Sequence, residues 1–115
     1  MDLSHSKYLI ETPNLSRVTN LEQLVLEDCV SLFKVHPSLV DLKNLKFLSL
    51  KKCKMLKSLP SSSYNLQSLE TFILSGCSKF EQFPENFGNL EMLKELYVDL
   101  FFLVEKTWDI IFWGM

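Results

Sequence analysis

The chain has 115 residues, a formal net charge of −2 at pH 7 and 47% hydrophobic residues. This length predicts one domain at most, and the apolar content is too high for a disordered segment. The nearly balanced charge gives no general argument for binding to nucleic acid or to an anionic membrane.

The first 20 residues are predicted to be an incomplete copy of a unit that returns later in the chain. Leu3 and Leu9 have the same spacing as Leu26 and Leu32, and a serine, Ser6, stands where the later unit has Cys29. The first leucine of the unit is missing, and no polar cap shields this end. Residues 1–20 therefore resemble the middle of a longer array.

A complete unit begins at Leu21 and recurs every 24 residues, at Leu45, Leu69 and Leu93. Read from these leucines, the sequence is LEQLVLEDCVSLFKV, LKFLSLKKCKMLKSL, LETFILSGCSKFEQF and LKELYVDLF. The shared frame is L-x-x-L-x-L-x-x-C-x-x-L-x-x-L. Its period lies within the range of about 20 to 29 residues that is typical of leucine-rich repeats. The sequence predicts such an array over residues 1–99, with its first and last units incomplete.

Each unit is predicted to hold one short strand, near residues 24–27, 48–51, 72–75 and 96–98. In L-x-L the two leucines are two residues apart, so both side chains point to one face of a strand. One unit cannot bury its own leucines, whereas stacked units can. The predicted fold class is therefore α/β. We expect a right-handed solenoid with a parallel sheet on its concave face and irregular or helical return arms.

The three cysteines, Cys29, Cys53 and Cys77, occupy one position of the frame, where the backbone turns inward. Their spacing follows the repeat and matches no zinc-binding pattern. The N-terminus has no basic segment followed by an apolar core, so we expect no signal peptide. A cytoplasmic or nuclear location and reduced, buried thiols are the corresponding expectations.

Residues 100–115, with the sequence LFFLVEKTWDIIFWGM, lose the frame abruptly and are predicted to be a non-repeat apolar tail. One interpretation is a C-terminal cap that folds over the last repeat. The other is an accidental tail from a truncated or misspliced reading frame, which the abrupt change favours. Glu105, Lys106 and Asp109 interrupt the apolar run, so we expect no membrane span of about 20 residues.

The x positions of the strands point away from the leucines and are free to vary. The column after the first leucine alternates in charge, which predicts a self-neutralising ladder: Glu22, Lys46, Glu70 and Lys94. The next outward columns mix apolar, aromatic and polar side chains, as surfaces that bind proteins do. The predicted concave-face contact residues are Gln23, Val25, Phe47, Ser49, Thr71, Ile73, Glu95 and Tyr97.

A basic patch is predicted at Lys51, Lys52, Lys54 and Lys57, one repeat after an acidic pair at Glu27 and Asp28. One interpretation is that these lysines are ordinary solvated side chains that form ion pairs between repeats. The other is that they contact an acidic partner or another domain of the same protein. The patch is small and has no interleaved aromatic residues, so we expect no nucleic-acid binding.

The sequence contains no recognisable catalytic constellation. There is no G-x-x-x-x-G-K-[ST] loop for a nucleotide, and three glycines in the whole chain leave little material for a phosphate cradle. His5 and His36 lie in different repeats without an acidic or thiol partner at a known catalytic spacing. We therefore expect a protein-binding module that is not an enzyme and uses no cofactor or metal.

Three runs of sequence resemble the repeats of plant intracellular immune receptors with a TIR domain, a nucleotide-binding switch and a leucine-rich array. They are LSHSKYLIETPNLSRVTNLEQLVLEDC, VHPSLVDLKNLKFLSLKKCKMLKSLP and ILSGCSKFEQFPENFGNLEMLKEL. The resemblance implies a module that senses pathogen effectors or contacts the receptor's own switch domain. It covers residues 1–97, and the TIR and nucleotide-binding motifs have no counterpart here. A free-standing adaptor or decoy made of repeats is the alternative.

Overall fold

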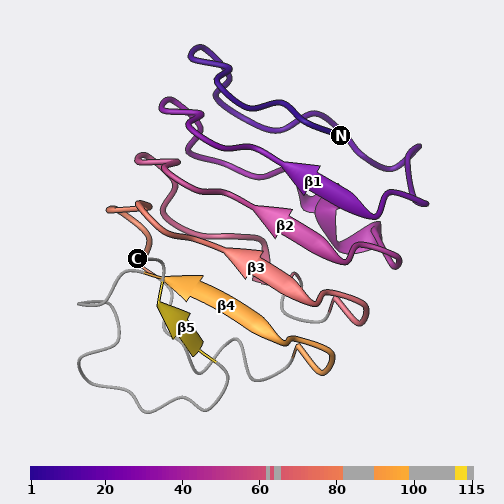
Figure 1. The fold of residues 1–115 in the computed structure, drawn as a ribbon. Helices are drawn as coiled ribbons and strands as arrows, with labels where there is room; N and C mark the ends of the chain where they lie inside the picture. The colour runs from indigo at the N-terminus through magenta and orange to yellow at the C-terminus, as the bar shows by residue number, and fades with distance from the viewer. Residues whose placement is uncertain (62, 64–65, 82–89, 99–110, 114–115) are drawn as a thin grey trace.

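The fold is built on one parallel β-sheet whose strands follow each other in chain order (Figure 1). A computed structural model describes residues 1–61, 63, 66–81, 90–98 and 111–113. Within these ranges the strands are β1 (Gln23–Val25), β2 (Phe47–Ser49), β3 (Thr71–Ile73), β4 (Glu95–Val98) and β5 (Ile111–Trp113). Strands β1 to β4 begin 24 residues apart, so the predicted parallel sheet of an α/β-type fold is confirmed.

The first three strands begin one residue earlier and end two residues earlier than the frame predicts. Hydrogen bonding continues for one more residue, because the Leu26 N–H donates to the Ser49 carbonyl at 2.9 Å. Two residues after Leu26 the backbone takes a left-handed turn at Asp28, with φ of 60°. That turn ends the extended conformation before the strand reaches its predicted length.

The left-handed turn recurs one residue before each cysteine. Its φ values are 60° at Asp28, 62° at Lys52 and 80° at Gly76, and His5 takes the equivalent place in the first repeat with 65°. Only glycine adopts this conformation without a steric cost, and Asp and His tolerate it better than most residues. A Cβ atom at Gly76 would also lie 3.2 Å from the Lys52 Cα, so close stacking adds a second reason for glycine there.

The core consists of leucine columns that run through the stack behind the sheet. In β1 to β4 the inward-facing residues are buried, and the registers of these strands place them side by side. Burying a leucine side chain stabilises a fold by about 1.5–3 kcal/mol. The two strand columns of the core are Leu24, Leu48, Phe72 and Leu96, followed by Leu26, Leu50, Leu74 and Val98.

The return arm between β1 and β2 contains a short 3-10 helix, η1 (Pro37–Asp41). Pro37 suits its first turn because proline has no N–H that would need a partner there. His36 caps the helix, accepting a hydrogen bond at Nδ1 from the Ser38 N–H at 3.1 Å. The Ser38 hydroxyl in turn accepts the buried Leu15 N–H at 2.7 Å, which ties the arm to the previous repeat.

Residues 1–3 run beside β1 and extend the sheet by an isolated parallel bridge between Asp2 and Val25. The Leu3 N–H donates to the Val25 carbonyl at 2.8 Å. Several apolar residues near this end are less covered than their equivalents further along, although Leu15 is already buried. Four of them are partly buried where the later equivalents are fully buried: Leu3, Leu9, Val18 and Leu21.

At the other end, β5 pairs in parallel with β4, with Leu96 opposite Ile111. This pairing places residues 111–113 of the predicted tail in the sheet, an arrangement that fits the cap interpretation (Figure 1). The remainder of residues 100–115 lies outside the described residues. Among the described residues, no helix has the length and apolar character needed to cross a bilayer.

Candidate functional site

The registers of the sheet bring the predicted contact residues together in two columns. Gln23 pairs with Phe47, Phe47 with Thr71 and Thr71 with Glu95. The second column, two residues further along each strand, follows the same pairing from Val25 to Tyr97. Because side chains alternate along a strand, both columns lie on the face opposite the leucines. We call this surface the sheet face: Gln23, Val25, Phe47, Ser49, Thr71, Ile73, Glu95 and Tyr97.

Exposure differs among the eight residues, and Ser49 departs from the prediction of an exposed position. Gln23 is exposed, six of the others are half-buried, and the relative exposure of Ser49 is 0%. The Ser49 hydroxyl donates to the Glu27 Oε2 at 2.7 Å. A long carboxylate from the previous repeat therefore covers the small serine. The side chain of Glu27 is therefore the one presented to solvent at this point of the sheet face. The repeat frame does not predict this, because it considers each position separately.

At the other end of the sheet face, Glu95 is held by two hydroxyl groups. The Thr71 hydroxyl donates to Oε1 at 3.2 Å, and the Tyr97 hydroxyl donates to Oε2 at 2.8 Å. The hydrogen bond to Glu95 raises the pKa of Tyr97, and partial desolvation adds to the shift. The carboxylate is thereby fixed in place beside an aromatic ring and the aliphatic side chain of Ile73, the register neighbour of Tyr97.

Of the four residues in the predicted charge ladder beside the sheet face, Glu70 and Lys94 lie within ion-pair distance of each other. Lys94 Nζ lies 3.9 Å from Glu70 Oε1, between positions that follow the first leucine of neighbouring repeats. The Glu70 N–H also donates to the Lys46 carbonyl at 2.9 Å, so the backbones of this column are in register. Exposed pairs of this kind contribute about 0–1 kcal/mol to the free energy of unfolding, so the ladder adds little to the stability of the fold.

The predicted basic patch divides into two parts. Lys51 and Lys52 lie beside the acidic pair of the previous repeat, since the Asp28 N–H donates to the Lys51 carbonyl at 2.8 Å. Lys54 and Lys57 lie further along the turn, 24 residues after the apolar residues Val30 and Phe33. All four lysines are exposed. Lys57 has an acidic neighbour as well, in the following repeat, because the Glu81 N–H donates to the Lys57 carbonyl at 2.8 Å.

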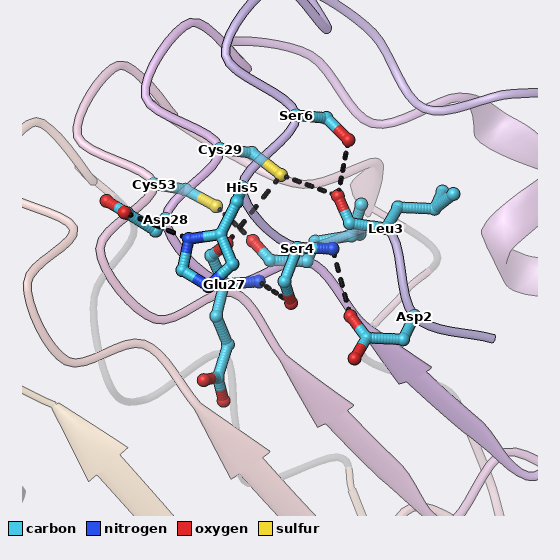
Figure 2. Close-up of polar contacts among 10 residues, drawn as sticks. Asp2, Leu3, Ser4, His5, Ser6, Glu27, Asp28, Cys29 and Cys53 are labelled. Atoms are coloured by element: carbon cyan, nitrogen blue, oxygen red, sulfur yellow. Dashed lines mark hydrogen bonds and ion pairs between the residues drawn. The ribbon is translucent and has the colours of Figure 1, made fainter.

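The cysteine column is a structural ladder. The Cys29 thiol donates to the Leu3 carbonyl at 3.3 Å (Figure 2), and the Cys53 thiol donates to the Leu26 carbonyl at 2.9 Å. The Cys77 thiol donates to the Leu50 carbonyl at 2.9 Å. Each thiol thus satisfies a carbonyl of the previous repeat.

Burial raises the pKa of Cys29, and it raises the pKa of Cys53 to about 12. Since the thiolate is the reactive form, these side chains are poor nucleophiles and poor metal ligands. Across the described residues, no group of three or more metal-ligating side chains comes together.

A polar cluster joins the first two repeats at the turn (Figure 2). His5 Nδ1 lies 3.2 Å from Asp28 Oδ2, and the Glu27 N–H donates to the Ser4 hydroxyl at 3.0 Å. The Ser4 N–H donates to Asp2 Oδ1 at 2.9 Å, and hydrogen bonding from Ser4 lowers the pKa of Asp2. His5 therefore has an acidic partner that its sequence spacing did not suggest. The pair is exposed and has no third group arranged for catalysis within the described residues.

Comparison with known proteins gives a partial match. A scan against protein-family models finds none that matches the chain. A stretch of 39 residues, 34% of this chain, is 56% identical to a probable disease resistance protein, RPP1, of Arabidopsis thaliana. The chain spans about 3% of the length of that relative. The similarity supports a region related to part of a plant resistance protein.

Proposed function

We propose that the chain is a leucine-rich repeat solenoid that recognises proteins, as a module of a plant immune receptor. In this proposal the sheet face is its concave surface, and the partner is a pathogen effector, a host protein that effectors target, or the receptor's own switch domain. The observation that carries the proposal is the 56% identity to a disease resistance protein over 39 residues. The exact 24-residue register, which displays variable residues on one face, supports it independently.

Recognition on the sheet face would rest on half-buried apolar side chains between two fixed carboxylates. Phe47 and Ile73 offer apolar surface that is already held by the sheet, so little side-chain entropy is lost when a partner covers it. Glu27 and Glu95 are oriented by hydroxyl donors and are ready to accept hydrogen bonds from a partner. Such a surface selects partners that present apolar groups flanked by donors or cations.

The proposed mechanism is binding without catalysis, in the cytoplasm or the nucleus. The thiols are protonated and engaged with carbonyl groups, and no described cluster combines a nucleophile with a base. A free-standing repeat protein that acts as an adaptor or decoy is the second candidate. The two candidates differ in genomic context, because a receptor module requires a reading frame for the TIR and switch domains immediately upstream.

Binding to two sets of purified proteins tests the proposal: switch domains of receptors of this class, and secreted effectors of plant pathogens. The variant Gln23→Arg/Thr71→Arg places two cations on the sheet face. Its matched control, Asn44→Arg/Ser58→Arg, places two cations at exposed positions of the return arms. We expect a partner whose affinity falls by about tenfold or more in the first variant and is retained in the control.

Equal loss of affinity in the two variants would contradict a specific role of the sheet face. Unchanged binding in the sheet-face variant would show that the partner contacts another surface of the molecule. Failure of every protein in both sets to bind the unmodified chain would remove the receptor-module proposal.

A further inference from the structure

Glu95, on the sheet face, is a carboxylate whose position is set by its neighbours. Its Oε1 accepts a hydrogen bond from the Thr71 hydroxyl at 3.2 Å, and its Oε2 accepts one from the Tyr97 hydroxyl at 2.8 Å. The two donors stand on different strands, β3 and β4, so the carboxylate is held from two sides. Each carboxylate oxygen keeps a second lone pair that can accept a hydrogen bond from a partner.

Glu95 forms no ion pair with any cation of the described residues, although two lysines lie in the same part of the sheet. Lys94 precedes it in the chain, but the Lys94 Nζ lies 3.9 Å from Glu70 Oε1. Lys46 precedes Phe47, which is two strands away, or about 10 Å at the usual spacing of strands. The charge of Glu95 is therefore left for a partner to neutralise.

The other carboxylate of this surface, Glu27, is in a different situation. Only one of its oxygens, Oε2, accepts a hydrogen bond from a neighbouring hydroxyl, that of Ser49. Lys51 occupies the equivalent position of the next repeat, 24 residues later, and brings a positive charge to that end of the strands. Glu95 is thus the better fixed and the less compensated of the two carboxylates.

The surroundings of Glu95 offer apolar surface that a partner can cover. Strand β4 has β3 on one side and β5 on the other, so the position of Glu95 is not an open edge of the sheet. Ile73 lies opposite Tyr97 in the register, and Phe47 lies opposite Thr71. These four side chains are half-buried. The result is an oriented carboxylate next to an aromatic ring, with aliphatic and aromatic surface on the adjoining strands.

We propose that Glu95 and Tyr97 anchor an arginine of the protein partner, whose neighbouring apolar side chain packs on Ile73 and Phe47. A guanidinium donates two parallel hydrogen bonds to a carboxylate and stacks on aromatic rings, whereas a lysine ammonium is a strongly hydrated point charge. This inference rests on the proposed function, because it names the chemistry by which the sheet face selects a protein.

A displayed library of random peptides, selected on the unmodified chain, tests this chemistry. We expect the selected peptides to carry an arginine next to Leu, Ile or Phe. Replacing that arginine by lysine should weaken binding by about fivefold. Glu95→Gln removes the charge, keeps the size of the side chain and should weaken binding by about tenfold or more. Tyr97→Leu removes the ring and should weaken it by about fivefold.

The matched control is Glu91→Gln, which removes a carboxylate from an exposed position in the turn before β4 and should bind the peptides as before. Selection of peptides without arginine, or of no peptide at all, would overturn the proposal. Equal binding of the arginine and lysine peptides, or equal affinities of the unmodified chain and Glu95→Gln, would also overturn it. Melting curves followed by circular dichroism confirm that each variant is folded.

The proposal and the function on which it rests fail in different ways. A switch domain or effector that binds through the sheet face, with the same affinity for Glu95→Gln, would overturn the arginine anchor and leave that function intact. Failure of all those proteins to bind would remove the receptor-module proposal. Arginine peptides that lose affinity in Glu95→Gln would then still support the anchor.

Discussion

The first and second repeats of this chain contain the same apolar frame but bury it to different extents. Four leucines further along the chain have exposures of 0–1%: Leu26, Leu32, Leu42 and Leu45. The residues at the equivalent positions one repeat earlier are only partly buried: Leu3, Leu9, Val18 and Leu21. The side chains are nearly identical, so the difference comes from position in the stack. At these positions a side chain is fully buried only when repeats lie on both sides of it, whereas Leu15 of the first repeat is already covered, with 1% exposure.

This comparison means that the stability of a repeat depends more on its interfaces with neighbouring repeats than on its own amino-acid composition. In such arrays, the free energy of unfolding is approximately a sum of contributions from single repeats and from their interfaces. Equal substitutions at equivalent positions should therefore have unequal effects in the first repeat and in the middle of the array.

The largest contrast is expected for a buried charge. Leu50→Asp places a carboxylate in a site of 0% exposure without a partner, which costs enough free energy to unfold the domain. Leu3→Asp, at the equivalent position of the first repeat, should leave a folded protein because its site is open to water on one side. Thermal unfolding followed by circular dichroism measures both. Equal losses of melting temperature would contradict the difference in burial.

A smaller contrast is expected for cavities. Leu45→Ala should lower the free energy of unfolding by about 3 kcal/mol, because the surrounding repeats cannot close a fully buried cavity. Leu21→Ala should lower it by about 1 kcal/mol, since water already reaches that side chain. Urea titration of both variants measures the difference. The comparison fails if Leu21→Ala is as destabilising as Leu45→Ala.

The cysteine column gives a prediction at alkaline pH. The pKa of Cys53 is raised from 9.0 to about 12 in the fold, so between these values the unfolded chain loses a proton that the folded chain retains. The stability contribution of the protonated thiol is therefore complete below pH 9 and is lost as the pH rises toward 12. The melting temperature should fall over this range, and less steeply in Cys53→Ala. An identical pH profile for the two proteins would show that Cys53 ionises as freely in the fold as in the unfolded chain.

The smallest effect is expected on the charge ladder. Lys94→Ala removes an exposed pair with Glu70 and should change the free energy of unfolding by less than about 1 kcal/mol. Added salt should reduce this difference further, because exposed charges are screened. A loss comparable to that of Leu45→Ala would show that the ladder, and not the leucine core, holds the repeats together.

The frame predicted the parts of the fold that depend on periodicity. Apolar residues two positions apart in each repeat predicted the inner face of the sheet, and the 24-residue spacing predicted the pairing of Gln23 with Phe47. The burial of Ser49 was not predictable in this way, because it depends on the length of Glu27 in another repeat. The pairing of β5 was also missed, since the sequence around residues 111–113 has lost the frame.

The candidate site was predictable as a surface but not as a set of contacts. The alternation of side chains along a strand placed Thr71, Glu95 and Tyr97 on one face, as the register shows. Their hydrogen bonds depend on rotamers that periodicity does not determine. The left-handed turn was visible at Gly76, where glycine indicates it. At Lys52 the same conformation has no sequence signal, because lysine does not favour it.

The central claim is that the outward columns lie side by side in one parallel sheet with a register of 24 residues. Solution NMR of the isotope-labelled chain tests it through contacts between backbone protons of neighbouring strands. The account predicts parallel contacts that join Leu24 to Leu48 and Leu48 to Phe72. Antiparallel contacts, or a register shifted by one residue, would turn the proposed recognition columns into the core and contradict the account.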